Sequence, residues 1–413
     1  MTERHDVVVI GAGQAGLATS HELSQRKVSH VVLEKGRIGE SWRSQRWDSF
    51  WLVTPNWTIT MPGGCYEGTD PEGFLPRQAW LDHLEGYARS FNAPVMSGVE
   101  TTRIVPGGRD GMFALATNRG VIEARNVVVA TGTYQRARPP PLWDRLAGVT
   151  HQLLATDYRN PDALEAGGVL VVGSGQTGCQ IAEELRAAGR ETFLCVGSAG
   201  RLPRRYRGRD CIDWQNRFGW LDRTPDMLEN PAMRFRGDPH VSGRDGGRTL
   251  SLHLLADAGV CLLGRINGVD GASIRLAPTL ADDLARSDAY ATNFLREVDQ
   301  YVTRTGIAAP PPAADEDLGF ARARGRRIEE AESLDLHAMG IKSVIWATGF
   351  GFDFSWIDFP VLDDAGYPVT RRGASAIPGL YFMGLNWMNK RKSGIIYGVG
   401  EDARHVARHI AAR

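Results

Sequence analysis

The stretch DVVVIGAGQAG, residues 6–16, decides the fold of this chain. Its apolar part, residues 7–10, is made of β-favouring side chains and predicts a buried strand. The glycines that follow have GxGxxG spacing and predict a strand-to-helix turn: Gly11, Gly13 and Gly16. In such a turn the first glycine permits the tight bend, the second leaves room for a pyrophosphate, and the third lets the helix pack against the strand. The N–H groups at the start of the helix then favour a phosphate.

An acidic residue stands where a dinucleotide ribose needs a hydrogen-bond acceptor. A second predicted strand, residues 29–33, ends in Glu34, about 20 residues beyond the glycines. A GxGxxG alone is a weak signal. The strand before it, the helix after it and the acid at this distance favour dinucleotide binding over a tight turn in some other α/β protein.

A second fingerprint, GVLVVGSGQTG at residues 168–178, repeats the first. Its glycines are each offset by 162 residues from those of the first fingerprint: Gly173, Gly175 and Gly178. A repeat of this kind predicts a second dinucleotide module. The strand that follows it, residues 191–196, ends in Gly197 and Ser198, where the first module has its acid.

Arginines follow the end of this strand, at positions 201, 204, 205, 207 and 209. A carboxylate there would repel a 2′-phosphate, whereas a hydroxyl and guanidinium groups accept it, so we expect the second module to prefer NADPH over NADH. Ser198 and Arg201 lie nearest the strand end and are the expected contacts. The alternative is that the stretch is a solvated basic loop.

A second repeat supports a discontinuous organisation. Residues 127–132, VVVATG, are echoed by residues 344–349, VIWATG, and each is a predicted buried strand that ends in Ala-Thr-Gly. Such strands lie where a chain leaves one module for the other. The sequence therefore predicts an α/β fold with two Rossmann-like domains. Residues 1–160 and 350–413 form the first, and residues 161–349 form the inserted second, with a substrate or lid-like insertion at about 206–334.

The amino-acid composition argues against several classes of binding partner. The chain has 48 basic and 48 acidic residues, so no net field recruits nucleic acid or an anionic membrane. Its five cysteines are widely spaced and form no CxxC, which argues against a disulfide framework, a zinc site or a dithiol pair. No metal constellation is evident. The charged N-terminus MTERHD leaves no room for a signal peptide, and no apolar run reaches the length of a membrane span, so we expect a cytoplasmic protein.

Two nucleotide modules, one acidic at the ribose and one basic, imply electron transfer from NADPH to a bound flavin. The sequence with these features resembles the class B flavoprotein monooxygenases. This group comprises flavin-containing, YUCCA-type and Baeyer–Villiger monooxygenases. More closely, it resembles bacterial flavoproteins that are often labelled as potassium-transport-associated oxidoreductases. The resemblance covers essentially the whole chain. It is carried by GAGQAG at 11–16, GESW at 39–42, ATG at 130–132, GSGQTG at 173–178, ATGF at 347–350 and KSGIIYGVGEDA at 392–403.

The resemblance implies FAD and NADPH as cofactors and O₂ and a small organic molecule as substrates. NADPH would reduce FAD, O₂ would add at the flavin 4a carbon, and the resulting (hydro)peroxide would oxygenate the substrate. By position, Glu34 would hold the FAD ribose, Trp42 would lie near the flavin, and Gly384 with the turn at 398–401 would bind its pyrimidine end. Asn56 is the catalytic candidate, with a turn-forming role after Pro55 as the alternative.

The remaining cofactor candidates belong to the two fingerprints and the two ATG strands. The full expected set is Gly11, Gly13, Gln14, Ala15, Gly16, Glu34, Trp42, Thr131, Gly132, Gly173, Ser174, Gly175, Gln176, Thr177, Gly178, Ser198, Arg201, Thr348, Gly349, Gly384 and Gly398.

The sequence departs from the family at its linker. The FxGxxxHxxx(Y/F/W) fingerprint survives only around Leu146, Gly148 and His151, and a Trp-Pro ending typical of Baeyer–Villiger enzymes is missing. This disfavours ketone-to-ester chemistry and leaves the role of His151 open. Two further functions stay open: a flavin reductase or oxidase that passes electrons to another acceptor or to O₂, and a non-catalytic dinucleotide sensor. The substrate is also open, and so is the oligomeric state, for which a homodimer is one candidate.

Overall fold

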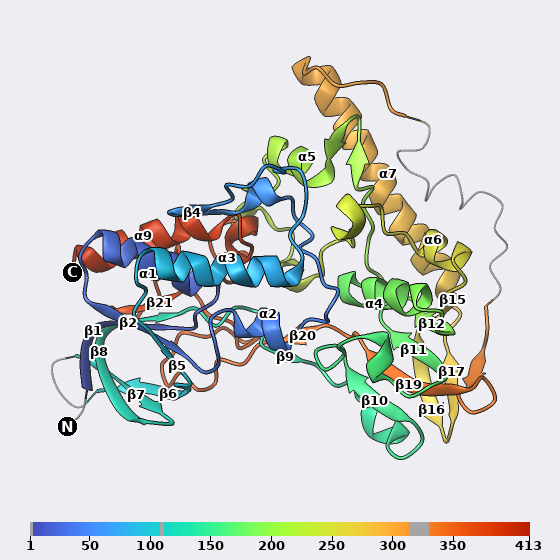
Figure 1. Cartoon of the computed structure of the whole chain (residues 1–413), viewed down its shortest axis with the longest axis horizontal. Helices are drawn as coiled ribbons and strands as arrows, with labels where there is room; N and C mark the ends of the chain where they lie inside the picture. Colours follow the sequence, from blue (N-terminus) through green and yellow to red (C-terminus); the bar gives the residue numbers. More distant parts are fainter. Residues whose placement is uncertain (1–2, 108–110, 314–329) are drawn as a thin grey trace.

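Two sheets divide the molecule into two halves, the first at the left of Figure 1 and the second at the right. The computed structural model describes residues 3–107, 111–313 and 330–413. Both termini of the described chain lie in the first half (Figure 1). This arrangement confirms the predicted α/β class with two Rossmann-like modules.

The first sheet runs in the order β5-β2-β1-β8-β7-β6, and β21 also pairs with β8. Strands β5, β2, β1, β8 and β21 are parallel, whereas β8, β7 and β6 form an antiparallel meander. The bounds are β1 Glu3–Ile10, β2 His30–Glu34, β5 Val95–Ser97, β6 Thr101–Pro106, β7 Phe113–Thr117, β8 Gly120–Val129 and β21 Leu380–Phe382. Helices α1 Gln14–Gln25, α3 Arg77–Ser90 and α9 Val399–Ala411 belong to the same half (Figure 1).

The second sheet is wholly parallel and runs in the order β10-β19-β11-β12-β15. Its strands are β10 His151–Leu154, β11 Gly168–Val172, β12 Thr192–Cys195, β15 Cys261–Leu263 and β19 Ile341–Trp346. Two helices, α4 Gln176–Ala187 and α6 Leu252–Asp257, accompany it. A separate antiparallel sheet consists of β16 Ile266–Asp270, β17 Ser273–Leu276 and β18 Ser333–Asp335.

Short elements complete the chain. They are α2 Glu40–Ser44, α5 Cys211–Arg217, β3 Thr60–Met61, β4 Gly64–Cys65, β9 Arg136–Ala137, β13 Arg205–Tyr206, β14 Arg209–Asp210 and β20 Phe350–Gly351. The 3₁₀ turns are η1 Asn56–Thr58, η2 Trp143–Leu146, η3 Pro161–Ala163, η4 Pro225–Met227, η5 Pro231–Phe235, η6 Arg244–Gly246 and η7 Arg391–Gly394.

The pattern of hydrophobic residues explains how strand β1 and helix α7 are buried. In β1, Val7, Val8 and Val9 are fully buried, as expected for a parallel strand covered on both faces. The long helix α7, Leu280–Thr305, buries residues at helical spacing along one side, from Leu280 and Leu284 through Ala291 to Val298.

Two strands of the second sheet come from parts of the chain where the sequence did not predict them. Strand β10, within the range expected for the first domain, is an edge strand of the second sheet, where His151 pairs in register with Ser343. Strand β15, within the expected lid-like insertion, pairs with β12 of the same sheet. The domain boundaries themselves stay a prediction.

A two-stranded ribbon joins the halves. Strand β9 follows the first ATG, β20 follows the second, and the two pair antiparallel, with Phe350 opposite Ala137. The chain therefore passes between its modules at the ends of the two ATG strands.

A buried carboxylate also links the halves. Glu184 of α4 is 7% exposed, and it accepts hydrogen bonds from the Ser49 hydroxyl at 2.5 Å and the Tyr158 hydroxyl at 3.0 Å. Burial raises the pKa of the Glu184 carboxyl, and these two hydrogen bonds offset part of the rise. The ionised form is thus disfavoured in the folded protein.

We expect Glu184→Gln to stabilise the protein at pH 8, by about 2 °C in Tm. A carboxyl whose folded pKa is raised binds more protons in the folded state, so stability falls as the pH rises from its ordinary pKa through the raised value. The amide still accepts one hydroxyl and donates to the other, without the charge. Thermal unfolding across pH 5 to 8 measures the difference between variant and wild type. A difference independent of pH would contradict the assignment.

Candidate functional site

The first fingerprint forms an open cradle at the start of α1. A methyl group added at Gly16 would lie 1.8 Å from the Gly11 carbonyl oxygen, so the helix can approach the turn only without a side chain there. Gly11 has a φ of +106° and packs against the Ala130 carbonyl, which a methyl group at Gly11 would approach to 2.7 Å. At Gly13, by contrast, a methyl group would meet nothing within 4 Å. This space in front of the helix fits a pyrophosphate.

The second fingerprint has nearly the same geometry. A methyl group at Gly178 would lie 1.8 Å from the Gly173 carbonyl oxygen, and one at Gly173, where φ is +108°, would lie 2.6 Å from the Ala347 carbonyl oxygen. A methyl group at Gly175 would again meet nothing within 4 Å. The 162-residue repeat in the sequence is therefore also a repeat of backbone contacts, and each ATG strand supports the turn of its own module.

Gly178→Ala and Gly175→Ala should separate packing from binding. The methyl group of Gly178→Ala overlaps a backbone oxygen, so we expect a loss of about 2 kcal/mol or more in the free energy of unfolding. Gly175→Ala points into open space, so we expect an unchanged Tm and NADP⁺ binding weakened by about tenfold or more. Thermal unfolding and titration calorimetry measure the two effects. An equal loss of Tm in both variants would contradict this account of the cradle.

Glu34 is held as an acceptor at the ribose end of the first module. Its two carboxylate oxygens accept the backbone N–H groups of Ala12 and Gly36, each at 2.8 Å. The residue is 7% exposed. Each carboxylate oxygen keeps capacity for a second donor, such as a ribose hydroxyl. The arrangement fits the role expected for Glu34.

The ribose end of the second module has no carboxylate at the matching position. Strand register pairs Ile10 with Leu33 and Val172 with Cys195, so the counterpart of Glu34 is Val196, one residue before the Gly197–Ser198 pair that the sequence suggested. The Ser174 hydroxyl accepts the Gly197 N–H at 2.9 Å, and Ser198 is exposed.

Two of the arginines that follow β12 form ion pairs within the protein. Arg201 is fully buried, and its Nε donates to Asp288 at 2.9 Å. Arg204 is 1% exposed and pairs with Asp210. The alternative of a solvated basic loop is therefore wrong for these two residues. Arg201 as a ligand of the 2′-phosphate stays a prediction, which requires its guanidinium to be reachable beside Asp288.

We expect Ser198→Asp to weaken NADP⁺ binding about tenfold and to leave NAD⁺ binding nearly unchanged. The exposed Ser198 follows β12, where an added carboxylate would repel a 2′-phosphate. Titration calorimetry with both nucleotides measures the effect, and Ser90→Asp, at the exposed end of α3, is the matched control. Equal weakening of both nucleotides would place the 2′-phosphate elsewhere.

The residues expected near the flavin gather around the start of α1. The Trp42 indole N–H donates to the Gln14 side chain at 3.1 Å. Gly384, with a φ of +69°, approaches α1 so closely that a methyl group on it would lie 2.7 Å from the Ala15 Cβ. Gly398, the N-cap of α9, has the Lys392 carbonyl oxygen 2.0 Å from the position of its missing methyl group. Trp42 and Gly384, which are distant in sequence, thus both contact the start of α1.

The turns after the ATG strands are fixed by the linking ribbon. The Gln135 amide donates to the Thr131 hydroxyl at 3.1 Å and to the Gly132 carbonyl at 2.8 Å. In the second module, the Thr348 hydroxyl donates to the Arg138 carbonyl at 2.8 Å. Gly349 adopts a φ of +95°. Both turns thus face the ribbon that connects the halves.

Asn56 is buried, at 2% exposure, in η1. Its amide nitrogen donates to the Asp70 carbonyl at 2.9 Å, and its backbone N–H donates to the Gly73 carbonyl at 2.9 Å. Its Oδ1 has no hydrogen-bond partner. The bonds to residues 70–73 agree with a structural role, while the unsatisfied oxygen leaves a polar atom for a ligand. The catalytic assignment stays a prediction.

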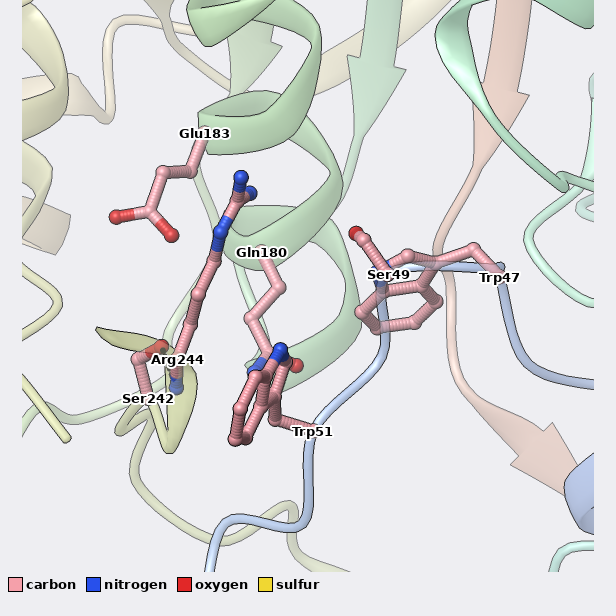
Figure 2. Close-up of a pocket in the computed structure, with 7 residues that line it drawn as sticks. All are labelled: Trp47, Ser49, Trp51, Gln180, Glu183, Ser242 and Arg244. Atoms are coloured by element: carbon pink, nitrogen blue, oxygen red, sulfur yellow. Dashed lines mark hydrogen bonds between the residues drawn. The ribbon is translucent and has the colours of Figure 1, made fainter. Parts of the chain in front are cut away.

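A small pocket lies where the loop at 47–51 meets α4 (Figure 2). It is lined by Trp47, Ser49, Trp51, Gln180, Glu183, Ser242 and Arg244. Gln180 Oε1 is buried without a partner, and burial raises the pKa of the Glu183 carboxyl. The pocket combines indole rings from the first half with polar groups from the second.

Sequence reasoning missed what the fingerprint residue Gln176 does. Its side-chain oxygen accepts the Val241 N–H at 2.9 Å, and its amide nitrogen donates to the Val241 carbonyl. This two-way bond holds the segment that carries Ser242 and Arg244 against α4. No local pattern signals it, because the two partners are 65 residues apart.

Comparison with known proteins places the chain in a family. The model of the pyridine nucleotide-disulphide oxidoreductases matches residues 8–207. A CzcO-like uncharacterized oxidoreductase of Geobacillus kaustophilus is 32% identical over 408 residues, which cover 98% of each chain. The rice indole-3-pyruvate monooxygenase YUCCA4 is 32% identical over 220 residues, 49% of each chain. A flavin monooxygenase structure from Stenotrophomonas maltophilia superposes with a TM-score of 0.67 at 19% identity and covers 100% of this chain and 99% of that one.

The chain therefore belongs to the CzcO-like oxidoreductases, and its fold is that of a flavin monooxygenase structure. It is an oxidoreductase, and the open space in front of each of the two helices fits a dinucleotide. None of the helices in the described residues is long and apolar enough to cross a membrane. Within the same residues, no three His, Cys, Asp or Glu side chains are grouped as metal ligands.

Proposed function

We propose that this protein is an NADPH-dependent FAD monooxygenase that inserts one oxygen atom from O₂ into a small organic substrate. The observation that carries the proposal is the pair of cradles of matching geometry, one with Glu34 at its ribose end and one with Val196 there. When bound, FAD supplies the electron transfer and the activation of O₂. The chain binds and orients the two dinucleotides and encloses the space between them.

Two further observations support this function over thiol-disulfide chemistry. The five cysteines are free, and Cys179, Cys195 and Cys211 are buried. Burial raises the pKa of the Cys195 thiol to about 12 and that of the Cys211 thiol to about 12. A thiol that stays protonated at neutral pH is a poor nucleophile and a poor electron relay.

Aromatic side chains at the junction of the halves support a small organic substrate. Phe50 packs against Trp42 and Trp47, with ring centroids 5.9 and 5.1 Å apart. Beside the linking ribbon, the rings of Phe350 and Tyr134 pack against each other at 5.4 Å. These faces exclude water and favour a planar molecule. The relative YUCCA4 is named for an aromatic substrate, indole-3-pyruvate.

Labelled oxygen tests the proposal. The FAD-loaded protein is supplied with NADPH, ¹⁸O₂ and a panel of aromatic acids, amines and thioethers, including indole-3-pyruvate. We expect one ¹⁸O atom in the product and little H₂O₂ when a substrate turns over, with Gly175→Ala as the matched control for NADPH dependence. Stoichiometric H₂O₂ without labelled product across the panel would favour an oxidase. Absence of FAD reduction by NADPH would favour a dinucleotide sensor.

A further inference from the structure

Arg46 lies at the junction of the two modules, just beyond the end of α2. Its guanidinium carbon is 5.4 Å from the ring centroid of Trp42, 5.8 Å from that of Phe50 and 5.6 Å from that of Phe350. Trp42 and Phe50 belong to the first half, whereas Phe350 directly follows the ATG of the second. The cation is thus surrounded by aromatic rings from both sides of the linking ribbon.

Arg46 has no carboxylate partner among the described residues. The hydrogen bond recorded for its side chain runs to the carbonyl of its own neighbour Gln45, at 2.8 Å. Nearby arginines differ, since Arg43 pairs with Glu85 and Arg77 pairs with Asp48. Burial lowers the pKa of Arg46 to about 10, so its guanidinium stays charged at neutral pH. A partly buried cation without an anion is costly, which points to a ligand.

The hydroxyl group of Tyr134 lies on the same side of the junction, because the Tyr134 ring packs against Phe350, one of the rings around Arg46. The Tyr134 ring packs edge-on against Phe350 at 5.4 Å, and the residue is 48% exposed. Its phenolic oxygen lies 3.5 Å from the Asn386 amide nitrogen, which donates to it. The hydroxyl proton therefore remains available for an acceptor. A cation, a hydroxyl donor and flat apolar faces together suit a planar molecule that carries an anionic group.

The dinucleotide phosphates are not the expected anion. Each pyrophosphate has a helix N-terminus of its own at Gly13 or Gly175, and the 2′-phosphate is assigned to the region of Ser198. Arg46 lies instead beside Trp42, whose indole bonds to Gln14 at the start of α1. A carboxylate matches the planar, paired donors of a guanidinium.

We propose that Arg46 binds the carboxylate of the substrate, and that the substrate class is therefore aromatic acids. The inference rests on the proposed function, because it names the substrate class of the proposed monooxygenase. It can nevertheless fail separately, since it concerns binding to the oxidised enzyme and needs no turnover.

Binding of a matched acid and amide tests the proposal. The FAD-loaded, oxidised protein is titrated with indole-3-propionate and with indole-3-propionamide, and the change in flavin absorbance is followed. We expect the acid to bind about tenfold more tightly than the amide in wild type. Arg46→Gln should remove this preference, and Arg46→Lys should keep part of it. Arg103→Gln, at an exposed ion pair with Asp358, should change nothing.

Several outcomes would overturn the proposal. One is equal binding of acid and amide by the wild type, whatever the variants do. Another is an unchanged preference in Arg46→Gln, or weakening of NADP⁺ rather than of the acid, which would assign Arg46 to the cofactor. If Arg46→Gln loses FAD, the comparison rests on Arg46→Lys. There, a preference for the acid equal to that of wild type would contradict the paired-donor contact.

Discussion

A helix can present its first N–H groups to a pyrophosphate only where no side chain separates it from the turn that precedes it. Both modules meet this constraint, and neither has room for a side chain at the third glycine. A methyl group added there would lie only 1.8 Å from the carbonyl oxygen of the first glycine. A methyl group on the first glycine would lie 2.7 Å in one module and 2.6 Å in the other from the carbonyl oxygen of the alanine that begins the Ala-Thr-Gly turn. Strand, turn, helix and ATG strand are therefore one unit of backbone packing, and dinucleotide binding depends on it.

The parts of the molecule that the sequence predicts are those whose geometry is local. A GxGxxG turn is determined by backbone conformation within one βαβ unit, so both cradles and the acid at Glu34 could be located by spacing alone. The ATG strands were found through their repetition. Strands β10 and β15 were not assigned to the second sheet, because parallel pairing joins segments far apart in the chain and leaves no pattern in either one.

Side-chain partners at the site were the least predictable feature. The sequence places Arg201 beside the end of β12, yet its partner Asp288 lies 87 residues further on, in α7. Whether a guanidinium faces a ligand or a buried carboxylate is decided by such tertiary contacts. Glu184 shows the same limit, since its donors Ser49 and Tyr158 come from segments outside the second fingerprint. Spacing locates the backbone of a binding site more reliably than the side chains that complete it.

Four charged side chains connect Asp222, within the range expected for the insertion, to the start of α9. Lys392, whose side chain is 7% exposed, reaches Asp222 at 3.1 Å and Glu401 at 2.6 Å, and Lys390 contacts the same two acids at 2.8 and 2.7 Å. An isolated exposed pair contributes little, but a shared network with a buried lysine fixes geometry. This network of four side chains thus joins the segment around Asp222 to the start of α9. Because Glu401 lies in α9, which belongs to the first half, the network holds the chain around Asp222 against that half.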